Sequence, residues 1–299
     1  MSRRPIKKGK TMKNDLLEKI KASIPEFSKG QRAIGNYILA NYDKAAFMTA
    51  SRLGEVTGVS ESTVVRFATA LGYEGYPELQ VALQELIRIR LTSVQRMEIT
   101  NDRIGEGDVL DSVLSSDMAK IRSTLETVSR HDFASASEAI VNAKRIYIIG
   151  VRSSASLASF LAFNFRFMFD NVTLVQTTSG SEIFEQLMRV SKDDVVIAIS
   201  FPRYSKRIIS AVEFARMQGA HIVALTDSAL SPIASHANST LYAKSDMVSF
   251  VDSLVAPLSI INALIVDIAR KKKTELQNVF SHLESIWDEY DVYDKDKGI

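Results

Sequence analysis

Three absences narrow what this chain of 299 residues is expected to do. It contains no cysteine, which excludes disulfide bridges and thiolate metal sites and fits a reducing compartment. The longest apolar run, residues 254–266, is too short to span a bilayer and is flanked by Asp252 and Asp267. The basic amino terminus is followed by no apolar segment of the kind that marks a secretory signal. We therefore expect a cytoplasmic protein without membrane segments.

The histidines also lack a functional pattern. They show neither metal-ligand spacing nor the order of a Ser/His/Asp triad, so we expect no metal, no cofactor and no catalytic residue. The four are His131, His221, His236 and His282. A hydrophobic content of 46% over this length is enough to bury sizeable cores, and it predicts two domains.

Charge is unevenly distributed along the chain. Residues 1–100 hold 16 Lys and Arg against 10 Asp and Glu, a net charge of +6. The remaining residues hold 21 against 25, a net charge of −4, which accounts for the +2 of the whole chain. Much of the basic excess lies in residues 1–14, for which we expect a flexible arm. A basic amino-terminal region is typical of proteins that contact nucleic-acid phosphates.

Residues 49–72 predict two short helices joined by a tight turn at Gly58. Glycine permits the positive φ that such a turn often needs, and Gly54 permits a close approach of the two helices. Ser60 is placed to cap the second helix and Gly72 to end it. This pattern predicts a helix-turn-helix. Its packing residues are Leu53, Val59, Val64, Phe67 and Leu71.

The spacing of the second helix leaves hydroxyl groups and one arginine on its outer face, which fits a DNA major groove. We expect Arg66 to contact a base edge or a phosphate, and Lys29 to be a further phosphate contact. Two readings stay open: Arg66 could instead brace Glu61 or Glu55, and glycine-linked amphipathic helices also occur in proteins that do not bind DNA. The predicted DNA-binding residues are Ser60, Glu61, Ser62, Thr63, Arg66, Thr69, Arg32 and Arg52.

Hydrophobic periodicity divides the chain into two domains. Residues 15–98 read as helical, and the polar residues 99–108 predict a linker. Beyond residue 144, short β-branched runs alternate with helical segments, as in a parallel sheet covered on both faces. We therefore expect an all-α helix-turn-helix domain, then an α/β three-layer domain with a five-stranded parallel sheet and a C-terminal helical tail, over residues 109–299.

The predicted strands are residues 145–150, 172–175, 194–200, 221–226 and 239–242. Helices are predicted at about 109–128, 133–142, 153–168, 181–190, 206–218, 230–236 and 248–272, with a tail that is helical as far as Tyr290.

The loops after the first, third and fourth strands are rich in hydroxyl groups and arginine. Ligands of open parallel sheets bind at the carboxyl ends of the strands, where loops lead into helices. Hydroxyls, backbone N–H groups and the positive end of a helix dipole suit a phosphate, and arginine adds charge-assisted bonds. The alternative is that the hydroxyls only cap helices. The predicted ligand-binding residues are Arg152, Ser153, Ser154, Ser200, Arg203, Tyr204, Ser205, Thr226 and Ser228.

These two regions resemble one known family. Residues 27–41, 53–59 and 60–76 are similar to the N-terminal domain of RpiR-type (MurR/RpiR) bacterial transcription regulators. The second half resembles the sugar isomerase (SIS) phosphosugar-binding domain that this family carries. Residues 150–154 stand in place of its first ligand loop and residues 200–205 in place of its second, while 226–232 resemble the segment after the fourth strand. The resemblance covers about residues 15–270.

The sequence departs from the family pattern in both ligand loops. Arg152 stands where the first loop usually has a second glycine, Arg203 stands near the usual glycine of the second, and Pro202 is unusual there. Because hydroxyls remain at the usual positions, a phosphate-sized site is expected to survive. We expect its ligand to be more anionic or larger than a simple hexose phosphate, unless the arginines turn outward or pair with Glu182 or Asp227.

The resemblance implies a DNA-binding regulator of carbohydrate metabolism genes. It would act as a homodimer or homotetramer built through the SIS domains, and an anionic carbohydrate derivative such as a sugar phosphate would change its affinity for double-stranded operator DNA. The alternative is a phosphosugar isomerase or lyase with an accessory helical domain, for which Glu182 is the candidate acid/base. A third reading is a helical scaffold, without DNA binding, fused to a sugar sensor.

Overall fold

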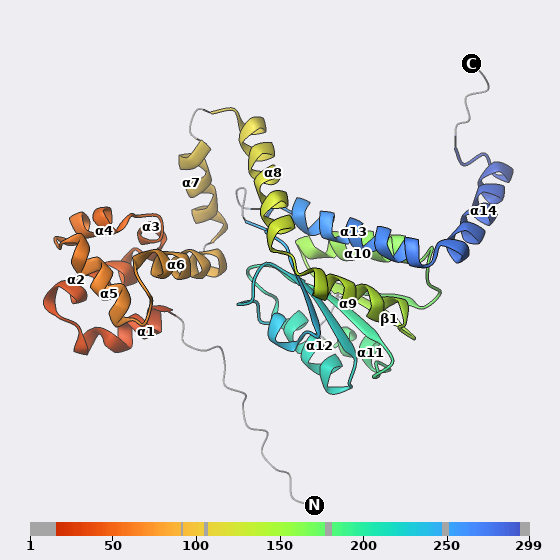
Figure 1. Ribbon diagram of the computed structural model, residues 1–299, viewed down its shortest axis with the longest axis horizontal. Helices are drawn as coiled ribbons and strands as arrows, with labels where there is room; N and C mark the ends of the chain where they lie inside the picture. Colours follow the sequence, from red (N-terminus) through yellow and green to blue (C-terminus); the bar gives the residue numbers. More distant parts are fainter. Residues whose placement is uncertain (1–15, 91, 105–106, 177–180, 247–250, 294–299) are drawn as a thin grey trace, which may run out of the picture. The chain divides into compact units, whose positions relative to one another are not determined.

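The computed structural model describes residues 16–90, 92–104, 107–176, 181–246 and 251–293 (Figure 1). The predicted basic arm, residues 1–14, lies outside this part. The chain forms two compact units that divide between Gln95 and Arg96. We call them the helical unit and the sheet unit. None of the helices in the described part of the chain combines the length and the apolar character needed to cross a lipid bilayer.

The helical unit is built around a core of fully buried aliphatic and aromatic side chains. Ile34 and Ile38 lie on one face of its second helix, while Leu79 and Leu83 lie on its last. The hydroxyl of Tyr76 donates to the carbonyl oxygen of Met48 at 2.8 Å and so fixes the last helix against the segment before the fourth. The elements are α1 (Leu16–Ser23), η1 (Ile24–Glu26), α2 (Lys29–Ala40), α3 (Tyr42–Ala45), α4 (Ala50–Thr57), α5 (Glu61–Ala70) and α6 (Tyr76–Arg90).

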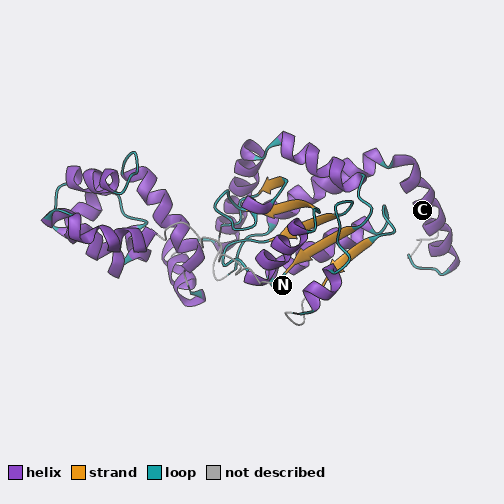
Figure 2. Cartoon of the chain, turned by 90° about the horizontal axis from the view of Figure 1, so that it is seen from below, coloured by secondary structure: helices purple, strands orange, loops and turns teal. Residues whose placement is uncertain are grey.

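The sheet unit contains five parallel strands in the order β2-β1-β3-β4-β5, as predicted in number and direction. Helices cover both faces of this sheet (Figure 2). The strands are β1 (Ile146–Gly150), β2 (Val172–Val175), β3 (Val195–Ile199), β4 (His221–Thr226) and β5 (Ser239–Tyr242). The helices are α8 (Val109–Thr127), α9 (Arg130–Val141), α10 (Ser153–Phe165), α11 (Glu182–Leu187), α12 (Lys206–Met217), η2 (Ala234–His236), α13 (Val255–Lys271) and α14 (Lys273–Glu289).

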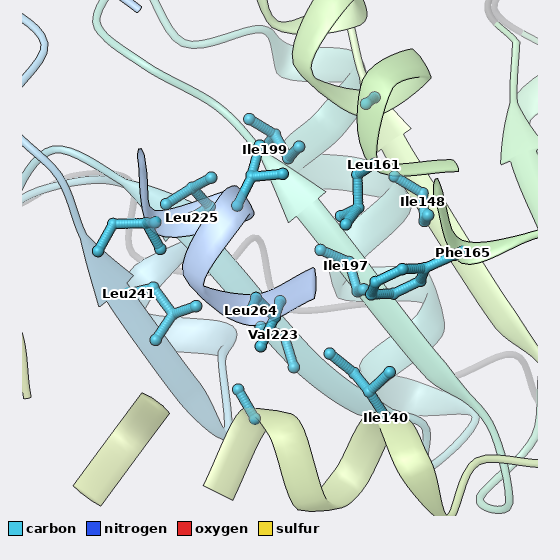
Figure 3. Packing of buried hydrophobic residues seen from close by; sticks show 14 of the residues in the cluster. Ile140, Ile148, Leu161, Phe165, Ile197, Ile199, Val223, Leu225, Leu241 and Leu264 are labelled. Atoms are coloured by element: carbon cyan, nitrogen blue, oxygen red, sulfur yellow. The ribbon is translucent and has the colours of Figure 1, made fainter. Parts of the chain in front are cut away.

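Alternate residues of the buried strands face opposite helical layers, because side chains of a strand point to its two faces in turn. Ile148, Ile197 and Val223 belong to the core beneath α9, α10 and α13, where Leu161, Phe165 and Leu264 meet them (Figure 3). The intervening residues, such as Ile149 and Val196, belong to a second core beneath α11 and α12. Both faces are therefore buried, which explains why the strands read as continuous apolar runs.

The amino-terminal edge of the sheet is held by a buried ion pair. Asp194 accepts hydrogen bonds from Arg145 at 3.0 and 2.8 Å, one to each carboxylate oxygen, and further bonds from the backbone and hydroxyl of Ser191. Burial alone would raise the pKa of Asp194, but the hydrogen bonds from Arg145 and Ser191 outweigh it and lower that pKa. Asp194 is thus ionised in the folded protein and ties β1 to the start of β3.

The predicted linker is the clearest difference between expectation and structure. Helix α7 (Ser93–Ile104) runs through residues 99–104, which the polar composition had assigned to a linker. Its start is a capping box, since Thr92 and Gln95 each accept a hydrogen bond from the other's backbone N–H. Arg96, buried on this helix, donates to Asp252 at 2.7 Å. A polar composition therefore belongs here to a helix rather than to an irregular segment.

Several predicted helices are shorter than expected: α10 ends at Phe165 rather than at residue 168, and α11 spans only Glu182–Leu187 of residues 181–190. Of residues 230–236, only Ala234–His236 form a helical turn, the 3₁₀ element η2, and the hydroxyls of Thr226 and Ser231 bond to each other in the segment before it. Helix α13 begins at Val255 rather than at residue 248, and residues 247–250 of that prediction lie outside the described part.

Candidate nucleic-acid interface and effector site

Helices α4 and α5 form the predicted helix-turn-helix. Gly58 has φ +70° and ends α4, and the N–H of Val59 returns to the carbonyl oxygen of Gly54 at 2.9 Å. A Cβ added to Gly54 would lie 2.7 Å from the Val59 carbonyl oxygen, so the turn passes too close for any side chain there. Leu53, Val64 and Phe67 are fully buried, as predicted, whereas Val59 is half-buried.

The carboxyl end of α5 is also as predicted. Gly72 has φ +82°, and the N–H of Tyr73 bonds to the carbonyl oxygen of Ala68 at 3.1 Å. This is a Schellman end, which places a left-handed residue directly after the helix. The recognition helix therefore spans Glu61–Ala70 with both ends defined by glycine-dependent turns.

The outer face of α5 carries Arg66 in an exposed position. Its guanidinium donates to the carbonyl oxygen of Ser62 and to the hydroxyl of Thr63, each at 3.3 Å. It is therefore bonded along its own helix, and the pairing with Glu61 or Glu55 that the sequence left open is not seen in the described structure. Glu61, Ser62 and Thr69 are likewise exposed, Thr63 is half-buried, and the Thr69 hydroxyl donates to Val65 one turn back.

A depression of about 500 Å³ joins the start of α5 to the start of α2. The two helices approach closely because α2 has Gly30 at this point, where an added Cβ would lie 3.2 Å from Thr63. Ser28 and Gln31 form a capping box at the start of α2. The sequence predicts Ser28 as the cap of this helix, which the structure confirms, but Ser28 and Gln31 are absent from the predicted DNA-binding residues. The lining residues are Ser28, Gly30, Gln31, Val59, Ser60, Thr63 and Arg66.

The remaining cations predicted to contact DNA lie on α2 and α4. Lys29 and Arg32 are exposed on α2. Arg52 is exposed on α4 and forms an ion pair with Glu55 at 2.8 Å, with both side chains more than half exposed. Pairs of this kind contribute little and exchange readily with other anions.

Helix starts differ in how their N-cap side chains are used. Ser28, Thr49, Asp108 and Ser129 each accept a hydrogen bond from the backbone and cap α2, α4, α8 and α9. Within the described residues, Ser60 does not cap α5 by its side chain, and instead its hydroxyl bonds to those of Ser62 and Thr63 at 2.9 Å.

The same contrast holds at the sheet. Ser205 precedes α12 and Arg152 precedes α10, and in the described structure neither helix has a side-chain cap. The alternative that Ser205 merely caps its helix is therefore not realised. The first turns of α5, α10 and α12 leave backbone N–H groups without a side-chain acceptor, and such groups attract anions.

The strand order brings the predicted ligand loops together. Strand β2 pairs with one side of β1, and β3 pairs with the other side. The direction in which strands are added therefore reverses here, and the switch point of the sheet lies between β1 and β3. Gly150 and Ile199 are direct neighbours in the two strands, and Ile199 in turn neighbours Leu225 of β4. Residues 151–154, 200–205 and 226–228 consequently leave the sheet side by side. We call them the switch-point site.

The first loop is a tight turn with arginine in a glycine-like conformation. Arg152 has φ 57° and ψ −127°, and Ser154 N–H bonds to Val151 O at 3.2 Å. These values are those of the second residue of a type II′ turn, which glycine normally occupies. A Cβ on the neighbouring Gly150 would lie 2.5 Å from the Ser154 carbonyl oxygen, so the turn folds back against the strand end. The Arg152 side chain is exposed.

The second loop has the same property. Arg203 has φ +66° and an exposed side chain. The next residue, Tyr204, donates its hydroxyl to Asp227 at 2.8 Å and so links this loop to the one after β4. Thr226 is fully buried, and its hydroxyl bonds to Ser200 O at 2.6 Å and to Ser231. The structure thus places the Thr226 hydroxyl in an internal network between the two loops.

The predicted serines lie at different depths. Ser154 and Ser200 are buried at the ends of β1 and β3, Ser205 is half-buried and Ser153 is exposed. The hydroxyl of Ser228 is buried and has no hydrogen-bond partner among the described residues. A buried hydroxyl without a partner is costly unless a ligand or water supplies one.

Glu182 was the single candidate for an acid/base in the enzyme alternative. It is half-buried at the first position of α11, while residues 177–180 before it lie outside the described part. No group of three His, Asp or Glu side chains arranged to hold a metal ion occurs in the part of the chain that the structure describes.

Two family models match this chain in the order in which its units occur. The helix-turn-helix domain of the rpiR family matches residues 14–88, and the SIS domain matches residues 139–267. The chain is also 27% identical to the transcriptional regulator HexR of Pseudomonas aeruginosa over 226 residues, which are 75% of this chain and 76% of HexR.

Two solved structures have the same fold. The NanR protein of Vibrio vulnificus, solved in complex with ManNAc-6P, aligns with 94% of this chain and 100% of its own, at a TM-score of 0.58 and 22% identity. The sugar isomerase domain of an RpiR transcription factor from Sphaerobacter thermophilus aligns with 58% of this chain and 96% of its own, at a TM-score of 0.55 and 27% identity.

The fold and its two sites define a helix-turn-helix transcriptional regulator with a SIS domain, rather than an enzyme of the SIS fold. Its relatives are named as regulators and share the helix-turn-helix that a metabolic isomerase does not need. The chain carries a helix-turn-helix domain of the rpiR family followed by a SIS domain.

Proposed function

We propose that this protein binds operator DNA through the outer face of α5, and that an anionic phosphorylated carbohydrate at the switch-point site changes its operator affinity. The observation that carries the proposal is shared by both surfaces: helices α5, α10 and α12 begin without side-chain caps beside hydroxyls and arginine. We further propose that it acts in the cytoplasm as a homo-oligomer, since a paired helix-turn-helix matches a palindromic operator.

On the DNA side, α5 enters the major groove. Arg66 exchanges its two 3.3 Å bonds within α5 for a base edge, while Ser62 and Thr69 contact the groove beside it. The depression between α2 and α5 receives a backbone phosphate, with Ser60 and Thr63 as hydroxyl donors. The margin of this DNA interface contains Arg32, Arg52 and Glu61. These residues adjust the position of the protein on the duplex and its affinity, rather than the choice of base.

The test is a duplex selected in vitro from random sequences by the full-length protein, followed by anisotropy titration at several salt concentrations. We expect affinity to fall steeply with salt, because phosphate contacts release counterions. Arg66→Ala should weaken operator binding by roughly 10- to 100-fold while the melting temperature stays nearly unchanged. Selection of no duplex, or an affinity independent of salt, would exclude DNA binding; full affinity in Arg66→Ala would remove Arg66 from the interface.

On the effector side, the phosphate lies between the uncapped starts of α10 and α12, within reach of Ser154 and Ser205. Ser153, Ser200 and the partnerless hydroxyl of Ser228 add donors from the three loops. Thr226 and Tyr204 hold the loops in place. That NanR was solved with a phosphorylated amino sugar supports a ligand of this general class.

Arg152 and Arg203 extend this proposal to the charge of the ligand. A non-glycine residue in such a conformation costs about 1–3 kcal/mol and is retained where the side chain is needed. Two arginines beside one phosphate position fit a second anionic group, such as the carboxylate of a sugar acid.

A matched pair of probes tests the charge of the ligand. We expect 6-phosphogluconate to bind more tightly than glucose 6-phosphate, and gluconate or inorganic phosphate to bind more weakly than either, as measured by calorimetry. Arg152→Gly should remove most of the difference between the first two while leaving glucose 6-phosphate binding in place. Equal binding of the two sugar phosphates would limit the site to the phosphate alone. Binding of neutral sugars only would contradict a phosphate site.

Coupling between the two sites is the last element of the proposal. Effectors of this kind typically change the affinity of the other site by ~1–3 kcal/mol, or 5- to 150-fold. The operator titration, repeated with saturating effector, measures this factor directly, and its sign distinguishes induction from corepression.

A further inference from the structure

The surface of α8 has its polarity reversed. A helix on a sheet normally turns apolar residues inward and polar residues outward. Here Lys120 and Thr124 are buried against the sheet unit, and Asp117 is largely covered beside them. The outward side instead carries five large apolar residues, each between 40% and 66% exposed: Leu110, Leu114, Met118, Ile121 and Leu125.

The polar side chains on the inward face of α8 form hydrogen bonds, which indicates that this orientation of the helix is specific. Lys120 donates to the hydroxyl of Ser116 at 2.7 Å and pairs with Asp117. Asp117 in turn accepts from Ser253 at 2.7 Å, and the Thr124 hydroxyl accepts from the backbone N–H of Lys244 at 2.9 Å. These bonds fix which side of α8 faces the rest of the sheet unit and leave the apolar stripe exposed.

A groove lies directly beside the stripe. Helices α8, α9 and α13 enclose a hollow of about 420 Å³, and α8 and α13 are in contact along it (Figure 1). Its lining is mostly apolar and includes Ile121 and Leu125 from the stripe. The other apolar members are Val128, Phe133, Ala256, Ile260, Ala263 and Val266. Single exposed apolar residues are ordinary, but a contiguous stripe beside an apolar groove marks an interaction surface.

We infer that the stripe on α8 and this groove form the interface with a second copy of the same chain. A ridge and a groove that lie side by side are self-complementary, because a two-fold axis inserts each ridge into the groove of the other copy. A specific dimer through these two faces needs to bury about 1,000 Å² or more in total.

Charge supports a second copy as the partner of this surface. The charged residues that line the groove are Arg130, Asp267 and Arg270, a net positive set, whereas the exposed charges within α8 are Asp111, Arg122 and Glu126, a net negative set. The two-fold arrangement therefore brings the acidic ridge of each copy to the basic rim of the other. The inference rests on the homo-oligomer of the proposed function and assigns it a surface.

The experiment compares full-length variants by sedimentation velocity. Met118→Glu places a charge at the centre of the stripe, and we expect it to weaken self-association by roughly 100-fold or more with unchanged helix content. Met217→Glu is the matched control, since Met217 is at least as exposed but lies on α12, and it should remain associated. The absence of native cysteine permits a second readout. A chain with Met118→Cys mixed with one carrying Val266→Cys should form a mixed disulfide between the two chains.

The outcomes distinguish an error in the assigned interface from an error in the proposed homo-oligomer. If Met118→Glu associates as tightly as the unchanged protein, or if no mixed disulfide forms, the assigned surface is wrong although the oligomer stands. If the unchanged protein is a monomer at all concentrations, the homo-oligomer is wrong as well, and the stripe is covered by another part of this chain or by a different protein. Neither result decides whether the protein binds DNA, because a monomer retains α5. The operator titration tests DNA binding separately.

Discussion

The helical unit and the sheet unit use left-handed backbone for different purposes. In the described part of the helical unit, positive φ occurs at Gly58 and Gly72, where only the direction of the chain matters. In the described part of the sheet unit, non-glycine residues have positive φ at Arg152 and Arg203 of the switch-point site and at Asp291 just after α14, while the turn after α12 uses Gly219. Glycine would remove the strain at both arginine positions, so replacing each arginine tests whether its side chain is needed there.

The largest expected effect tests whether the switch-point site, at the carboxyl ends of the strands, depends on the Arg145–Asp194 ion pair at their amino ends. Asp194→Ala removes the partner of Arg145 and should lower the stability of the sheet unit by about 2–4 kcal/mol, since Arg145 is partly exposed. Urea unfolding followed by Trp287, the single tryptophan, reports on this unit. Effector affinity should be unchanged in the folded variant. A loss of effector affinity would show that the two edges are coupled.

The same carboxylate predicts a pH dependence. Because the folded pKa of Asp194 is lowered, the group stabilises the protein above its unfolded pKa, near 3.9, and that stability is lost as pH falls through the folded value. We expect the unchanged protein to lose stability below about pH 4. Asp194→Ala should show a smaller loss over the same range.

The next effect separates two roles of glycine in the helical unit. Gly54→Ala brings a Cβ to 2.7 Å from a backbone oxygen and should cost about 2–3 kcal/mol. Gly58→Ala meets nothing within 4 Å and should cost only about 1 kcal/mol, for its φ of +70°. Hydrogen exchange of residues 16–90 measures both. Equal losses would mean that close approach is not what α4 requires of Gly54.

A smaller effect of opposite sign tests the strain directly. Arg152→Gly and Arg203→Gly should each raise the free energy of unfolding by up to about 1 kcal/mol, because glycine adopts their conformations without strain. Arg207→Gly, within α12, is the matched control and should lower it by about 1 kcal/mol. Destabilisation by all three substitutions would show that the two left-handed arginines are there for stability and not for a ligand.

The smallest effect concerns Arg52 on α4. Because its ion pair with Glu55 is exposed, Arg52→Ala should change stability by less than about 0.5 kcal/mol. If Arg52 contacts a phosphate, the slope of operator affinity against salt should fall by about one unit. An unchanged slope would leave Arg52 as a surface residue of α4.

Most of the fold was predictable because its signals are local. The five strands were placed within one residue at nearly every end, since a parallel sheet buried on both faces produces short apolar runs between helices. The helix-turn-helix was equally predictable from Gly54, Gly58 and the spacing of Val64 and Phe67. The error at residues 99–104 arose where a helix is polar, so that composition resembled a linker.

The candidate sites were predictable in part. The residues of the switch-point loops were named from hydroxyl and arginine content, and the strand order then brought those loops together. The internal role of the Thr226 hydroxyl was not visible, because its partner Ser200 lies 26 residues away. The contribution of α2 to the depression beside α5 was missed for the same reason, although its capping box was present in the sequence.

The sequence alone determined where the five strands and the helices α4 and α5 lie, and which end of the chain carries the positive charge, since each depends on neighbours within a few residues. Only the tertiary structure decided that β1 lies between β2 and β3, that Arg152 and Arg203 adopt left-handed conformations, and that α8 turns its apolar side outward. These features depend on contacts between residues far apart in the chain, which local patterns do not encode.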